Sequence, residues 1–150
     1  MADIDQARVH LEGIERLILA LKAKDERAAE QAAAVLGTSG HPKALKPLID
    51  YCLLYSPLGG YRNDPGAPYG EQARIRARVG PLEELVKLSA RQLAEEDLQT
   101  LHSLNDSSFF LRVDYDTPGY GSGADDFTVV LNFARIRDLA ARESRRRQGC

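Results

Sequence analysis

The sequence predicts a mainly α-helical protein, a stack of five or six helices arranged as α-hairpins, with one small β-hairpin (about 109–133) and a final helix. Three observations predict this fold class. Apolar residues recur every three or four positions between residues 3 and 22. An alanine-rich segment at 25–37 is followed by a turn and a proline that can open another helix. Two runs of strand-forming residues, 109–115 and 127–133, flank a glycine-rich connection.

The composition is that of an ordinary globular domain. Of 150 residues, 43% are hydrophobic and 28% are charged, which favours one folded domain over residues 1–150. No apolar run approaches the roughly 20 residues of a membrane-spanning helix, and the first residues do not resemble a signal peptide. Cys52 and Cys150 form no Cys-x-x-Cys pair, so we interpret them as a buried thiol and a tail thiol. We therefore expect a cytoplasmic protein with no membrane partner.

Three helices are predicted in the first third of the chain. The stripe in 3–22 gives one apolar face, which favours packing against the core, although a dimer contact stays open. In the second helix, Gly37 is expected to provide the C-terminal end. Pro42 is expected to open the third helix, and His41, directly before it, to act as a turn or capping residue.

A sequence signature follows between residues 26 and 53. An alanine-rich helix ends in Leu-Gly, a short turn carries a proline, and a second helix contains Ala-Leu. These places are taken by Ala32, Ala33, Leu36, Gly37, Pro42, Ala44, Leu45, Leu48 and Ile49. This arrangement resembles a HEAT repeat. The resemblance implies a stack of helical hairpins and a scaffold that binds proteins or nucleic acids, while some lyase-like relatives act on bilin chromophores.

The rest of the chain departs from that pattern and is predicted from periodicity. Residues 56–70 contain four glycines and three prolines, which predicts a long loop. Gly80-Pro81 is expected to break or restart the helix that follows, so a second repeat between 72 and 104 is doubtful. Further helices are expected at 71–79, near 95–104 and at about 134–146, and the tail 145–150 is expected to fray.

Tyrosines and arginines are the first candidates for a binding surface, because these side chains often anchor interfaces. The candidates are Tyr61, Arg62, Tyr69, Arg74, Arg78 and Tyr120. Arg74 and Arg78 lie one helical turn apart and share a face, which a solvated polar face also explains. Our first hypothesis is a protein-binding adaptor or scaffold module. It would use a helical face edged by the 56–70 and 114–126 loops, with another protein as partner.

Four carboxylates around the glycine-rich connection give an alternative. They are Asp114, Asp116, Asp125 and Asp126. If the hairpin brings them together, their oxygens suit Ca²⁺ or Mg²⁺, which predicts a metal-binding protein or an enzyme. The simpler interpretation is that they keep the strand ends soluble. Residues 119–124 match the sequence pattern of a dinucleotide-binding motif, but a strand rather than the required helix is predicted after them. No catalytic triad can be assembled from the spacing of the residues, so we expect neither a cofactor nor catalysis.

The charge distribution gives a third alternative. The net charge is −2, but residues 131–150 carry six arginines against Asp138 and Glu143, so that end is near +4 and the rest near −6. Together with Arg74 and Arg78, this basic end makes nucleic acid a possible partner. We do not favour it because the chain as a whole is acidic. The arginine run 145–147 is interpreted as an exposed helix end rather than a phosphate-binding tail.

Overall fold

The structure, a computed structural model, describes residues 2–57, 67–117 and 121–149, and the side chains within 11–57, 68–113 and 123–149. These residues form six α-helices, two short 3₁₀ turns and one two-stranded antiparallel sheet. In chain order they are α1 (Ala2–Ala20), α2 (Glu26–Ser39), η1 (Pro42–Ala44), α3 (Leu45–Leu53), α4 (Ala67–Ser89), η2 (Ala90–Gln92), α5 (Glu95–His102), β1 (Ser107–Thr117), β2 (Gly121–Leu131) and α6 (Ala134–Gly149). The predicted fold class is confirmed.

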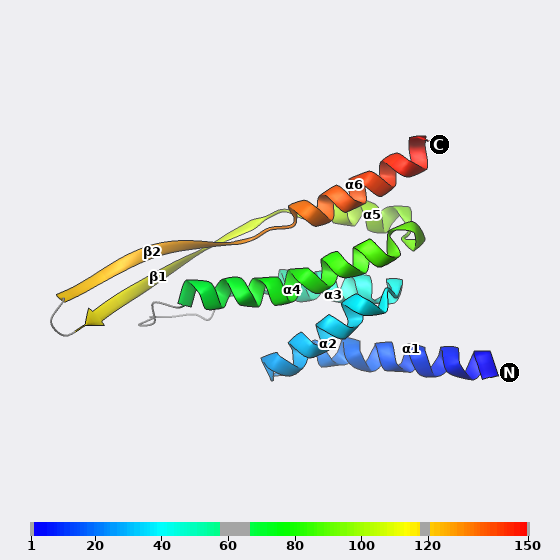
Figure 1. The fold of residues 1–150 in the computed structure, drawn as a ribbon, viewed down its shortest axis with the longest axis horizontal. Helices are drawn as coiled ribbons and strands as arrows, with labels where there is room; N and C mark the ends of the chain where they lie inside the picture. The colour runs from blue at the N-terminus through cyan, green and yellow to red at the C-terminus, as the bar shows by residue number, and fades with distance from the viewer. Residues whose placement is uncertain (1, 58–66, 118–120, 150) are drawn as a thin grey trace.

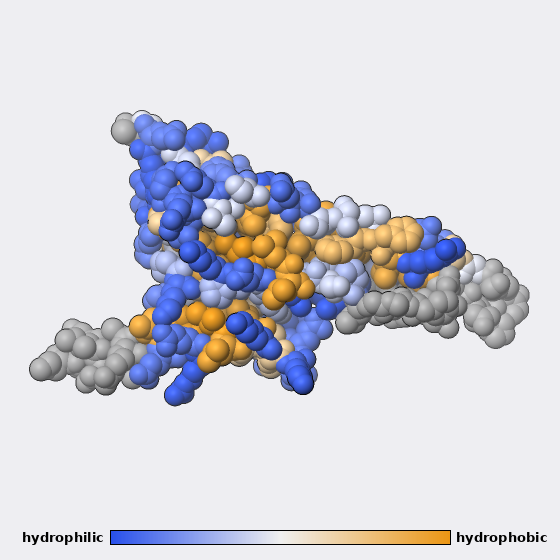
Figure 2. Space-filling model, turned by 180° about the vertical axis from the view of Figure 1, so that it is seen from behind, coloured by the Kyte–Doolittle hydropathy of each residue, from blue (hydrophilic) through white to orange (hydrophobic). Residues whose placement is uncertain are grey.

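The long helix α4 lies in the middle of the stack (Figure 1). Helices α2 and α3 pack against it, α1 covers α2, and α6 with α5 lies on the opposite side. Fully buried Leu36, Leu48, Leu82 and Phe133 belong to one apolar core that joins these layers. Seen from behind, apolar side chains gather over the middle of the helical body and continue along the hairpin (Figure 2).

The contact between α2 and α4 explains why the predicted end of the second helix was wrong. We expected Gly37 to end a helix, but α2 continues to Ser39, and Gly40, with φ of 63°, provides the left-handed C-cap. A Cβ atom on Gly37 would lie 2.6 Å from the carbonyl oxygen of Pro81. Gly37 is therefore glycine because the backbones of α2 and α4 touch there.

Helix α4 also passes through the expected break. Gly80-Pro81 lies inside it, and Leu82 and Leu85, both fully buried directly after the proline, anchor the second half to the core. The helix begins at Ala67, so the last four residues of the expected 56–70 loop are helical. Residues 58–66 of that loop lie outside the described residues.

Two local predictions near α3 are confirmed. The Nδ1 atom of His41 accepts a hydrogen bond from the backbone N–H of Lys43 at 3.1 Å and so caps the turn that Pro42 opens. Cys52 is completely buried, and its burial raises the pKa of the thiol to about 12. This thiol is therefore a packing residue rather than a nucleophile.

The two strands of the β-hairpin are each longer than the predicted runs, and the second ends at Leu131 rather than at 133. Ser107 pairs with Leu131 and Thr117 pairs with Gly121, so the glycine-rich segment expected as a loop is largely strand. Side chains alternate between two faces. Phe109 and Val129 pack on the core, whereas Phe110, on the other face, is 68% exposed. In Figure 1 the hairpin runs beside α4 and extends past its N-terminal end.

Candidate functional site

A groove with a volume of about 530 Å³ lies between α4, the end of β2 and the start of α6; we call it the α4–α6 groove. On α4 its lining residues recur three or four positions apart, among them Ile75 and Val79, and so occupy one side of the helix. Val130 and Ile136 line it from the opposite wall. Ligand pockets in proteins have volumes of about 300–1,000 Å³, so the groove is large enough to hold a ligand.

The floor of the groove is aliphatic and continues onto the hairpin. Ile75 and Ile136 belong to the buried core, and Val130 is 37% exposed. Phe110 lies diagonally across the hairpin from Val130 and on the same face, because Val130 pairs with Ser108 and Phe110 with Thr128. Two exposed apolar side chains, Val130 in the groove and Phe110 beside it, therefore share one face of the hairpin with Ser108 and Thr128.

Two arginines stand on opposite walls of this groove, Arg76 on α4 and Arg135 in the first turn of α6. Both are exposed, and neither guanidinium makes a hydrogen bond or ion pair with a described residue. The acidic lining residue, Glu83, lies 3.7 Å from the ammonium of Lys87. The groove therefore presents positive charge above an apolar floor.

The opposite face of α4 packs against α2 and α3, and its polar side chains bind other residues of the protein. The Nε atom of Arg74 donates to Glu26 at 2.7 Å, and its NH1 atom donates to Glu71 at 2.8 Å. Glu71 is completely buried and also accepts a 2.6 Å hydrogen bond from the hydroxyl of Tyr55. Burial, together with this bond to Glu71, raises the pKa of Tyr55. These contacts join α4 to the start of α2 and the end of α3.

Arg78 is held in the same way one turn later. Its NH1 atom donates to the carbonyl oxygen of Tyr51 at 2.6 Å, and its guanidinium lies 4.3 Å from the centre of the Tyr51 ring. The carbonyl oxygen of Arg78 accepts the thiol hydrogen of Cys52, with 3.2 Å between the two heavy atoms. The side chains of Arg74 and Arg78 are only 16% and 12% exposed. Both predicted contact residues therefore bind the protein's own acceptors.

The other predicted contact residues do not gather around these two arginines in the described part of the chain. Tyr69 lies in the first turn of α4 and is 80% exposed. Tyr61, Arg62 and Tyr120 lie outside the described residues. The predicted surface is thus represented by one exposed tyrosine and two arginines that are largely buried.

The acidic residues of the predicted metal site are part of the strands. Asp125 and Asp126 are consecutive in β2, so their side chains point to opposite faces, and Asp126 lies 3.8 Å from Arg112. Asp114 and Asp116 belong to β1, and their side chains lie outside the described set. Among the side chains that are described, no three His, Cys, Asp or Glu residues lie close enough to share a metal ion.

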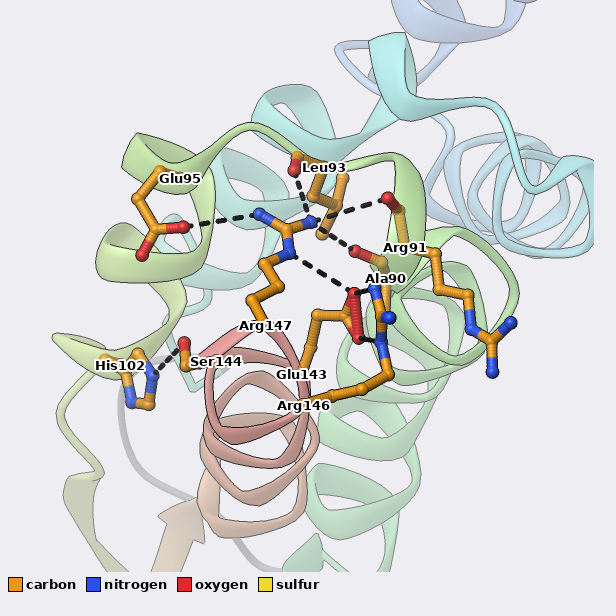
Figure 3. A network of polar contacts seen from close by, with 9 residues as sticks. All are labelled: Ala90, Arg91, Leu93, Glu95, His102, Glu143, Ser144, Arg146 and Arg147. Carbon is orange, nitrogen blue, oxygen red and sulfur yellow. Dashed lines mark hydrogen bonds and ion pairs between the residues drawn. The ribbon is translucent and has the colours of Figure 1, made fainter. Parts of the chain in front are cut away.

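The arginine-rich tail, which the sequence predicts to fray, belongs to α6, and this helix continues to Gly149. Arg147 donates to the carbonyl oxygens of Ala90 at 3.2 Å and Leu93 at 2.7 Å, and its NH1 atom lies 3.3 Å from Glu95 (Figure 3). The carbonyls at a helix C-terminus lack partners within the helix. Arg147 supplies such partners in the η2 turn and so joins α6 to the end of α4.

Glu143 holds the two last arginines of this run in place. It is 5% exposed and accepts hydrogen bonds of 2.6 and 2.8 Å from Arg146 and one of 3.3 Å from Arg147. The bonds from Arg146, followed by the one from Arg147, lower the pKa of Glu143 from 4.5 to about 2. Two of the three arginines in the run are therefore occupied within the fold (Figure 3).

Sequence reasoning missed the groove arginines. Arg76 stands between Arg74 and Arg78 in the chain, and only the packing of α2 and α6 on different sides of α4 separates their environments. No family model, curated protein or solved structure matches the chain. In the described part of the chain, no helix is both long enough and apolar enough to cross a bilayer.

Proposed function

We propose that the protein is a protein-binding module whose contact surface is the α4–α6 groove together with the exposed hairpin face around Phe110. The observation that supports this proposal is that the aliphatic groove floor, bordered by Arg76 and Arg135, has the exposed Phe110 on the same hairpin face as its lining residue Val130. An apolar centre with a polar rim is the usual anatomy of a protein interface, and arginine is enriched there. Contiguous exposed apolar surface on a folded domain commonly marks an interaction site.

The alternative functions have less support. Asp125 and Asp126 point to opposite faces of the hairpin, so they do not converge on one metal ion. Arg74 and Arg78, the basis of a nucleic-acid face, are engaged with Glu26, Glu71 and backbone oxygens. An adaptor that binds without catalysis is therefore the function we propose.

We also propose that α2, η1 and α3 form a HEAT-type hairpin. The support is local: the left-handed Gly40 ends α2, Pro42 opens η1, and Leu36, Leu45 and Leu48 are buried in the core that α2 and α3 share with α4. Such hairpins suit a scaffold because they present a rigid helical surface to a partner. A cytoplasmic location stays a prediction from the sequence.

The proposal is tested by selecting binders from a library of random displayed peptides. We expect the wild-type chain to enrich peptides whose binding is lost in Val130→Asp, because a hydrated carboxylate then replaces an aliphatic part of the groove floor. Val35→Asp is the matched control, since Val35 is an exposed valine on α2 outside the groove. Enriched peptides that bind both variants equally well would place the contact surface elsewhere.

A further inference from the structure

We infer that the α4–α6 groove takes an extended peptide segment in which acidic side chains alternate with aliphatic ones. This inference rests on the proposed function and names the chemistry of its partner. The groove combines two features that one ligand must satisfy together. Its floor is formed by aliphatic side chains, among them Ile75 and Val130, and its walls carry the guanidinium groups of Arg76 and Arg135.

The charge argument follows from what the other arginines do. Arg74 and Arg78 neutralise Glu26 and Glu71, whereas Arg76 and Arg135 meet no acceptor among the described residues. A guanidinium binds a carboxylate through two parallel hydrogen bonds, so acidic side chains are the complementary groups.

The length of the groove matches an extended chain. Its lining residues on α4 run from Gln72 to Glu83, a rise of about 17 Å at the usual 1.5 Å per helical residue. An extended segment of about five residues covers that distance, because each residue advances about 3.3 Å. Since side chains of an extended segment alternate in direction, aliphatic residues can face the floor while carboxylates between them reach the two arginines.

A peptide fits this surface better than a nucleic acid. None of the groove-lining residues is aromatic, so bases find no stacking platform there.

The test uses the displayed random peptides and the full chain. We expect enriched sequences to carry an excess of Asp and Glu spaced by aliphatic residues. Individual peptides should bind Arg76→Glu/Arg135→Glu about tenfold or more weakly than wild type, and added salt should weaken their binding to wild type. The same peptides with lysine in place of the acidic residues should regain binding to the charge-reversed chain.

The control is Arg91→Glu/Arg145→Glu, which changes the net charge equally at two exposed arginines outside the groove and should leave binding unchanged. Enriched peptides that lack acidic residues, or that bind the Arg76→Glu/Arg135→Glu chain normally while Val130→Asp abolishes binding, would overturn this inference but leave the proposed function standing. Enrichment that does not depend on Val130 would overturn both.

Discussion

The two faces of α4 carry similar residues but differ in the contacts that these residues make. On one face, Glu71, Arg74 and Arg78 lie in a network of ion pairs and hydrogen bonds that joins α4 to α2 and α3. On the other face, Arg76 points into a groove with no described partner. The comparison teaches that an arginine's role depends on whether the neighbouring helix supplies a buried carboxylate or an open aliphatic floor.

Helix α6 repeats this contrast along its own length. Arg147, near its C-terminus, donates to the carbonyl oxygens of Ala90 and Leu93, whereas Arg135, in its first turn, lines the groove. Both helices thus use some arginines to hold the fold and leave one exposed on the same groove. The first predictions concern the packed face of α4, the face that carries Glu71, Arg74 and Arg78 and contacts α2 and α3.

The largest expected effect concerns the contact of α2 with the packed face of α4. In Gly37→Ala, the new Cβ would lie 2.6 Å from the carbonyl oxygen of Pro81, so the two helix backbones must separate. We expect the free energy of unfolding, measured by urea denaturation, to fall by about 2–3 kcal/mol. Gly13→Ala is the control, because no atom lies within 4 Å of its added Cβ. A Gly37→Ala chain as stable as wild type would contradict the packing.

The next effect tests whether Arg147 holds α6 to the end of α4. Arg147→Ala leaves the carbonyl oxygens of Ala90 and Leu93 without this donor. The expected loss is about 2 kcal/mol in the free energy of unfolding, again from urea denaturation. Arg145→Ala, at an exposed position in the same run, should change stability by no more than about 0.5 kcal/mol. Equal losses in the two variants would show that the run acts only through its charge.

A smaller effect is expected from the hydroxyl group of Tyr55. Tyr55→Phe removes the 2.6 Å hydrogen bond to Glu71, a carboxylate that is completely buried. We expect a loss of about 1–2 kcal/mol, seen as a lower thermal midpoint. Tyr69→Phe, at a tyrosine that is 80% exposed, should keep the wild-type midpoint. If both variants behave alike, the hydroxyl of Tyr55 does not stabilise the packed face.

The subtlest effect is a pH dependence. Glu143 has a folded-state pKa of about 2, below its ordinary 4.5, because Arg146 and Arg147 donate to it. Its stabilising contribution is therefore complete above pH 4.5 and is lost as the pH falls towards 2. Over that range wild type should lose stability more steeply than Glu143→Gln, as followed by urea denaturation at each pH. The exposed Glu96→Gln should follow the wild-type curve, and a Glu143→Gln curve parallel to wild type would refute the assignment.

The sequence predicted the helices and the hairpin because their periodicities are local properties. The 3–22 stripe, the His41 cap and the strand-forming runs depend on neighbours within a few residues. The errors at Gly37 and Pro81 arose from packing that local patterns do not show: Gly37 lies against α4, and Leu82 and Leu85 after Pro81 are buried in the core. The contacts of the tail were not predicted for a similar reason, since Arg147 finds acceptors more than fifty positions away in the chain, at Ala90 and Leu93.

For the candidate site, the sequence predicted the type of residue but not which arginines would line it. Arginine as an anchor residue followed from composition, but Arg74 and Arg78 could not be told apart from Arg76 without knowing which side of α4 meets Glu26. The groove joins α4 to residues about fifty to sixty positions later, such as Val130 and Ile136. No spacing rule connects segments that far apart, so the site emerged only from the three-dimensional packing.

The most direct test of the difference between the two faces of α4 is urea denaturation of Arg74→Ala beside Arg76→Ala. Removing Arg74 breaks its 2.8 Å ion pair with the completely buried Glu71 and its 2.7 Å ion pair with Glu26, so the free energy of unfolding should fall by about 2 kcal/mol. Removing Arg76 should change it by no more than about 0.5 kcal/mol, because this side chain holds no described residue. Equal losses in the two variants would contradict the division of α4 into a structural face and a binding face.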